Sequence, residues 1–97
     1  MTALPRAIAT IKIDEPRVRV TEYRFAPGAE TGWHRHEHDY VVVPLLAGRL
    51  QFEEAGGTVR TAELLTHQPY ARQAGVEHNV INANGFEFAF LEIELMR

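Results

Sequence analysis

The sequence contains no cysteine among its 97 residues. This absence excludes disulfide bonds, thiolate nucleophiles and cysteine-based zinc sites. No apolar run approaches the roughly 20 residues that a membrane-spanning helix needs, so we expect no membrane partner. Residues 1–10 also lack the long apolar core of a secretory signal peptide. Together these absences predict a cytoplasmic protein.

An excess of positive charge is also missing. The chain carries 10 Lys and Arg against 13 Asp and Glu, a formal net charge of −3. A nucleic-acid-binding domain needs a basic surface, so we expect no nucleic-acid partner. The hydrophobic fraction of 45% is enough for a core, and the length predicts a single domain over residues 1–97. Because so short a chain buries only part of its surface, we expect a homodimer.

Sustained helical periodicity is absent as well, and short alternating segments take its place. Turn signals separate these segments, most clearly at Gly56-Gly57 and Asn84-Gly85. Residues 1–10 are expected to form a loose N-terminal arm or an edge strand. The predicted strands cover residues 11–14, 17–25, 33–46, 49–54, 59–65, 70–74, 78–82 and 86–96. This spacing predicts an all-β sandwich or barrel.

The stretch from residue 34 to residue 40 carries the main chemical signal. Three of the five histidines, His34, His36 and His38, occupy alternate positions, and Tyr40 continues the alternation. In an extended strand these side chains share a face. Imidazoles gathered in one small space repel one another if charged and are costly to bury if unpaired. A divalent cation resolves both problems, because neutral imidazole is its most common protein ligand.

The same stretch lies inside a longer motif. Gly28 is followed after five residues by His34-x-His36, and the motif closes at Gly48. A second motif follows later in the chain, with the spacing Gly-x-x-His-x-x-x-Asn.

In this second motif Gly75 precedes His78 and Asn82, and Gln73 stands where a proline is usual. On these two motifs, from Gly28 to Asn82, the sequence resembles the cupin family. The resemblance implies a single-domain barrel of six to eight antiparallel strands, known as a jelly roll or double-stranded β-helix.

The resemblance also implies three metal ligands, His34, His36 and His78. The family's usual fourth ligand is a glutamate, but Tyr40 and Val41 occupy the positions where it would fall. Three neutral imidazoles leave the 2+ charge of an ion uncompensated, which favours an anionic small-molecule ligand. Because Tyr40 alternates with the three histidines, it should point inward with them, where it could ligate the ion or donate a hydrogen bond to a bound anion.

The expected ion is Fe2+, with Ni2+, Zn2+ or Mn2+ as alternatives. Iron would make the protein a three-histidine, dioxygenase-like enzyme for a small carboxylate or dicarbonyl metabolite, and the other ions an isomerase or lyase. Tyr40 and His38 are the candidate catalytic residues. The alternative function is a non-catalytic cupin that binds or senses a small metabolite. A third hypothesis is a barrel whose histidines bind no metal.

Residues 22–45 are also similar in sequence to a group of small single-domain bacterial cupins. Some of these are associated with β-alanine degradation. The remaining polar residues have structural interpretations: His38 could belong to the rim of the pocket, and Asn82 stabilises a turn or strand. Exposed or solvated side chains are expected at His67, Arg24, Arg72, Gln73, Glu92 and Glu94.

Overall fold

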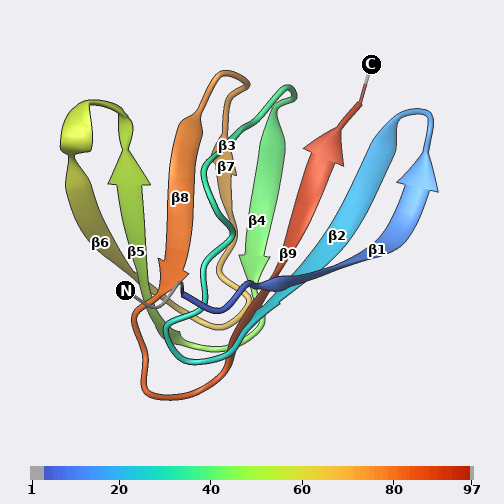
Figure 1. Cartoon of the computed structure of the whole chain (residues 1–97). Helices are drawn as coiled ribbons and strands as arrows, with labels where there is room; N and C mark the ends of the chain where they lie inside the picture. The colour runs from blue at the N-terminus through green and yellow to red at the C-terminus, as the bar shows by residue number, and fades with distance from the viewer. Residues whose placement is uncertain (1–3, 97) are drawn as a thin grey trace.

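The computed structural model describes residues 4–96, which form two antiparallel β-sheets (Figure 1). The first sheet has the strand order β1-β2-β9-β4-β7, and the second has the order β3-β8-β5-β6. The strands are β1 (Ile8–Glu15), β2 (Val18–Phe25), β3 (His34–Arg35), β4 (Tyr40–Pro44), β5 (Gly48–Glu54), β6 (Val59–Leu64), β7 (Tyr70–Arg72), β8 (Glu77–Asn82) and β9 (Phe88–Leu95). Within the described residues, no helix is long and apolar enough to cross a membrane.

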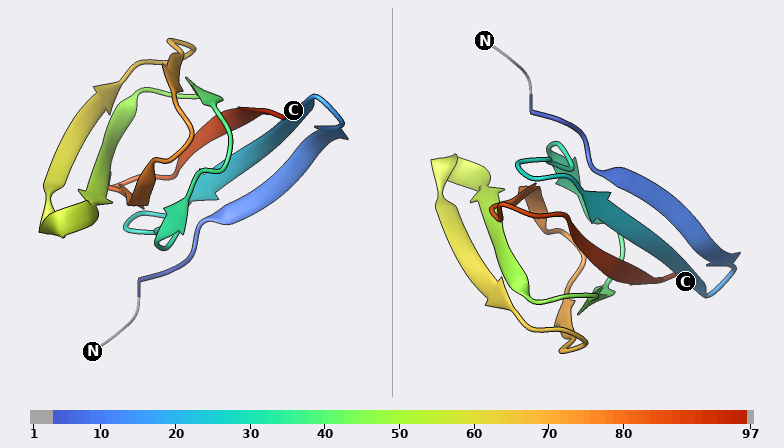
Figure 2. Two further views of the ribbon diagram at one scale, coloured as in Figure 1. Left: turned by 90° about the horizontal axis from the view of Figure 1, so that it is seen from above. Right: turned by 90° about the horizontal axis from the view of Figure 1, so that it is seen from below.

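The two sheets curve around a shared interior, seen from above and below in Figure 2. Phe25, Phe88 and Phe90 enter this core from the first sheet, and Leu50 and Phe52 enter it from the second. All five side chains are at most 4% exposed, and each contributes about 1.5–3 kcal/mol of burial free energy. The predicted all-β, antiparallel jelly roll is therefore confirmed, but residues 4–96 form nine strands where six to eight were expected.

The predicted strand over residues 33–46 is wrong, because the chain changes sheets in its middle. β3 pairs with β8 in the second sheet, whereas β4 pairs with β7 and β9 in the first. Residues 36–39 make the crossing and have no strand partner. His36 instead exchanges backbone hydrogen bonds with the loop before β8, donating to Val76 and accepting from Gly75 at 2.8 Å each. Alternation along the chain carries no signal for such a change of sheet.

The first strand begins earlier than the pattern predicts and is wholly exposed. β1 starts at Ile8 and pairs only with β2, so it forms the outer edge of its sheet. A register shift between Ile11 and Ile13 interrupts the pairing. The β1–β2 hairpin extends to one side of the barrel (Figure 2). Residues 1–3 of the predicted N-terminal arm lie outside the described residues.

One buried amide, that of Asn82, ties several segments to the end of β8. Its Nδ2 donates to the carbonyl oxygens of Phe25, Ala26 and Phe86 at 2.9–3.2 Å. Its Oδ1 accepts from the backbone and the side chain of Asn84 at 2.9 and 2.7 Å. Asn82 is 1% exposed, and its polar atoms are all paired, as a buried polar group requires. It therefore has the structural role that its sequence position indicated.

Candidate metal centre

Three histidines from two segments converge inside the barrel. His34 in β3 lies directly opposite His78 in β8, so the antiparallel register brings their side chains to one face. His36 follows two residues later and is buried beside them. The Nε2 atom of His36 is 3.0 Å from that of His34 and 3.2 Å from that of His78. One ligand atom from each residue lies within 4.8 Å of the others, so the group could hold a metal ion.

The loop before β3 fixes the proton on one of these rings. Nδ1 of His34 lies 2.9 Å from the carbonyl oxygen of Gly32. A carbonyl only accepts, so Nδ1 carries the hydrogen and Nε2 presents its lone pair to the cluster. Gly32 is held in turn by Asn79, whose Oδ1 accepts from its backbone at 2.9 Å. A histidine oriented through its other nitrogen is the usual preparation of a metal ligand.

Burial keeps the other two rings neutral. Desolvation, with smaller effects from the charges of His34 and Arg72, lowers the pKa of His36 to about 4. Desolvation, followed by the charges of His34 and His36, lowers the pKa of His78 to about 3. Three imidazole Nε2 atoms that face one another cannot all be satisfied by hydrogen bonds among themselves. A divalent cation would accept all three lone pairs, so this donor set fits one.

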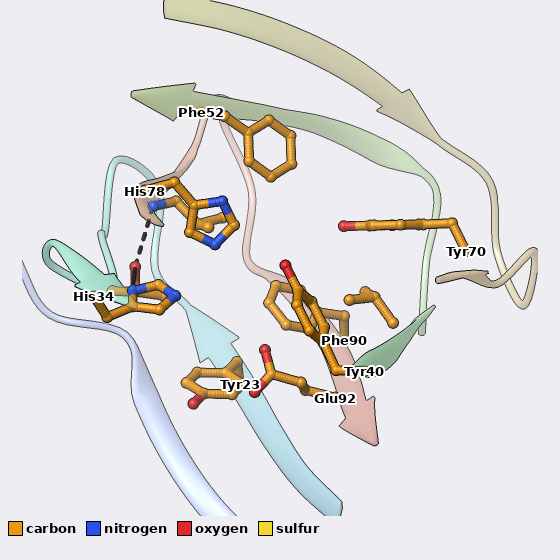
Figure 3. A pocket seen from close by; sticks show the side chains of 11 residues that line it. Tyr23, His34, Tyr40, Phe52, Tyr70, His78, Phe90 and Glu92 are labelled. Atoms are coloured by element: carbon orange, nitrogen blue, oxygen red, sulfur yellow. Dashed lines mark hydrogen bonds between the residues drawn. The ribbon is translucent and has the colours of Figure 1, made fainter. Parts of the chain in front are cut away.

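Tyr40 lies against this cluster. Its ring stacks on that of His36, with centroids 3.8 Å apart and planes 15° from parallel. Its hydroxyl points toward the centre of the cavity in Figure 3. Burial raises the pKa of Tyr40, so the hydroxyl keeps its proton and can donate a hydrogen bond to an anion. None of the hydrogen bonds found within residues 4–96 includes this hydroxyl.

A carboxylate that the sequence analysis assigned to the surface also reaches the site. Glu92 on β9 is 6% exposed, and its Oε1 lies 3.9 Å from Nε2 of His36. Burial, with a smaller effect from Glu94, raises the pKa of Glu92 to about 7. The expectation of an exposed face is wrong, because Glu92 continues the inward face of Phe88 and Phe90. The alternation along β9 could have identified it.

The other predicted site residue, His38, lies outside the cluster. It is half-buried and lines an outer groove of about 320 Å³ with His34, His36 and several charged side chains. On the inner side, His34 and His78 border a cavity that Figure 3 shows. The lining includes all three tyrosines of the chain, namely Tyr23, Tyr40 and Tyr70. The free space in this cavity, about 10 Å³ measured at the centre of a water molecule, has room for roughly one water.

In the metal-free protein, we expect the free energy of unfolding to fall as the pH is lowered from about 6.5 to 4.5. In this window the unfolded chain protonates His36 and His78 at their ordinary pKa of 6.5, whereas the folded protein keeps both neutral. Glu92 opposes this effect, because its folded carboxyl is already protonated there. In this window the unfolded chain holds two more protons on the histidines and one fewer on Glu92 than the folded protein does. The net difference of one proton lowers the free energy of unfolding by roughly 1.4 kcal/mol per pH unit, which urea unfolding can measure.

Removing the opposing group should steepen this dependence. Glu92→Gln is expected to roughly double the slope, since only the two histidines then contribute. His67→Gln, in an exposed loop, is the control and should keep the slope of the unmodified protein. A stability that stays level or rises on acidification would contradict the burial of neutral imidazoles.

Comparisons with known proteins agree with this fold. No family model matches the chain. Among curated proteins, the β-alanine degradation protein BauB of Pseudomonas aeruginosa is 56% identical over 95 residues, covering 98% of this chain and 99% of that protein. Among solved structures, a cupin domain from Bordetella pertussis is 52% identical with a TM-score of 0.96, and each chain is covered in full.

A more distant structure has the same architecture. A Klebsiella pneumoniae protein with a double-stranded β-helix domain is 18% identical and has a TM-score of 0.77, covering 98% of this chain and 81% of that one. At that identity the likeness shows the fold alone. The full-length match at 52% identity goes further, and it agrees with the two histidine motifs and the jelly-roll topology. This chain belongs to the cupin superfamily.

Proposed function

We propose that His34, His36 and His78 bind one divalent metal ion, and that the protein converts a small anionic metabolite at that ion. The observation that carries the proposal is the convergence of three Nε2 atoms 3.0 and 3.2 Å apart. Two ligand atoms at bonds of about 2.1 Å and right angles to each other are about 3 Å apart. The spacing of His36 from each of the other two donors therefore suits a shared ion, and all three ligand atoms lie within 4.8 Å of one another.

The proposed ion is Fe2+, with Ni2+, Zn2+ and Mn2+ as the alternatives that imidazole also suits. Bound iron would supply a centre for dioxygen chemistry, and the other ions would supply a Lewis acid for isomerase or lyase chemistry. An all-histidine set leaves the 2+ charge uncompensated by its ligands, which favours an anionic substrate. Glu92 lies nearby, but it is not one of the three converging donors.

The chain's own residues would orient the substrate and handle protons. The inward hydroxyl of Tyr40 would donate a hydrogen bond to a carboxylate or carbonyl oxygen of the substrate. His38 lines the outer groove beside two of the proposed ligands, so its proposed role is proton exchange with that groove. Tyr40 and His38 therefore remain the proposed catalytic residues.

The Pseudomonas relative supports a narrower substrate class. Its name ties it to β-alanine degradation, and the identity of 56% covers nearly all of both chains. β-Alanine and the products of its breakdown are short carboxylates. We therefore propose that the substrate of this protein is a short carboxylate of about this size.

The first test of this proposal is metal content. The purified protein should hold one divalent ion per chain by elemental analysis, and His36→Ala should lose it, because two imidazoles bind an ion far more weakly than three. His67→Ala and His38→Ala are the controls and should retain it, since neither residue belongs to the converging group. Anomalous scattering at several absorption edges would then identify the ion. Unchanged metal content in His36→Ala would contradict the proposed ligand set.

A second measurement separates an enzyme from a binding protein. The iron(II)-loaded protein is expected to consume oxygen with a member of a panel of short carboxylates and 1,3-dicarbonyl compounds. Tyr40→Phe should lower that rate by about 100-fold, because it removes a hydrogen-bond donor aimed at the substrate. If a panel member binds but no loaded ion turns it over, the protein is instead a carrier or sensor.

We also propose that the protein is a homodimer that pairs through β1. This edge strand is exposed along its whole length, and Ile8 and Ile11 are 64% and 58% exposed. Unpaired edges and clustered exposed isoleucines favour association. Ile11→Lys should therefore shift the sedimentation coefficient from dimer to monomer, whereas Thr61→Lys on the exposed edge strand β6 should not. A monomeric unmodified protein would refute the proposal.

A further inference from the structure

Arg72 is a half-buried arginine without a carboxylate partner. Arginines 19, 24, 35, 49 and 60 each form an ion pair, with N–O distances of 2.7–3.8 Å. Within residues 4–96, no ion pair or side-chain hydrogen bond was found for Arg72. The expected solvated side chain is therefore wrong, because Arg72 is only partly exposed. A partly desolvated guanidinium is costly unless an anion accepts its hydrogen bonds.

The register of β7 explains why Arg72 is only partly exposed. In the β4–β7 pair, Arg72 lies opposite Tyr40 and Tyr70 lies opposite Val42. Opposed residues of an antiparallel pair project to the same face. Tyr40 and Val42 are both 2% exposed and belong to the core. Tyr70 and Arg72 therefore face the interior of the barrel, next to the tyrosine that stacks on His36.

A groove of about 260 Å³ opens at these residues, between the outermost strands of the two sheets. Phe52, Arg60, Tyr70 and Arg72 line it together with two aliphatic side chains of β6. Arg60 is already occupied, because its Nε donates to Glu54 at 3.1 Å and its guanidinium lies 4.5 Å over the ring of Phe52. Arg72 is the guanidinium in this groove that is free to bind an anion.

The groove and the histidine cavity are adjacent. Phe52 and Tyr70 line both of them, and the cavity continues to His34 and His78. In Figure 3 the Tyr70 hydroxyl points toward the centre of the cavity. Within the described residues it has no hydrogen-bond partner on the protein. Tyr70 thus lines both the groove that holds Arg72 and the cavity that reaches His34 and His78, and its hydroxyl can donate a hydrogen bond.

We infer that Arg72 and Tyr70 form a carboxylate-binding subsite that fixes one end of a short substrate while its other end lies at the three histidines. This inference rests on the proposed function, since it assigns the recognition of that same substrate. A guanidinium can bind a carboxylate through two parallel hydrogen bonds, and the phenol can add a third. The class of ligand is a short aliphatic acid with a second polar group at its far end.

The outer groove is a poorer place for an anion. Its arginines, Arg19 and Arg35, are already paired with carboxylates. Three glutamates, Glu37, Glu92 and Glu94, share its lining. A carboxylate entering there would meet like charge, whereas the groove at β6 and β7 presents an unpaired cation beside apolar side chains.

The experiment is an NMR titration of the full-length, zinc-loaded protein with propanoate, with neutral propanamide as the matched probe. Propanoate should shift the backbone amides of residues 70–72 and 60, and propanamide should shift them far less. Arg72→Met should weaken propanoate binding by about tenfold or more, and Arg72→Lys by less, because a charge-assisted bidentate contact is lost. Arg17→Met removes the same charge from an exposed turn and should leave binding unchanged.

Two further variants separate this inference from the proposed metal function. In His36→Ala, which should lack metal, propanoate should still shift residues 70–72; a complete loss would mean that the carboxylate binds the ion, and it would overturn the subsite. Tyr70→Phe should weaken binding several-fold while metal content stays unchanged. Equal propanoate affinity in Arg72→Met and the unmodified protein would also overturn the subsite, as would shifts confined to Arg19, Arg35 and His38.

Discussion

The pairing of two residues, His34–Arg35, with the start of β8 is the interaction on which the site depends. These two residues form β3, the shortest strand of the barrel, and its register places His34 directly opposite His78. His36 then lies within 3.2 Å of His78, because its backbone is bonded to the loop that precedes the same strand. A contact between segments more than 40 residues apart therefore organises the cluster, and local strand preference could not form it alone.

Neutrality is the second constraint on this cluster. Burial lowers the pKa of His36 and of His78, so the interior holds lone pairs in place of positive charges. Around this neutral centre the charged groups are unevenly distributed. Acidic side chains and paired arginines line the outer groove, whereas the groove between β6 and β7 contains the unpaired Arg72. The electrostatic asymmetry gives the barrel two chemically different grooves near one set of histidines.

The sequence was informative wherever a signal was local or carried by a motif. Alternation and turn residues predicted most strands, and the two motifs identified His34, His36 and His78 as candidate ligands. The alternation along β9 places Glu92 on the inward face of Phe88 and Phe90, so its burial was predictable from the sequence. Two features had no local signal. The crossing of residues 36–39 between sheets is a property of the topology, and the inward direction of Arg72 depends on its register with Tyr40. Both are set by partners distant in the chain.

The buried amide of Asn82 has a consequence for how this protein can change over evolutionary time. It lies four residues after His78 on the same strand, and its five hydrogen bonds secure the loop after β2 and the β8–β9 loop to that strand. Strand β8 thus joins the histidine cluster at its start to the loops that Asn82 holds at its end. Drift in those loops would displace an imidazole without touching it, so the loops around Asn82 are less free to diverge than their surface position suggests.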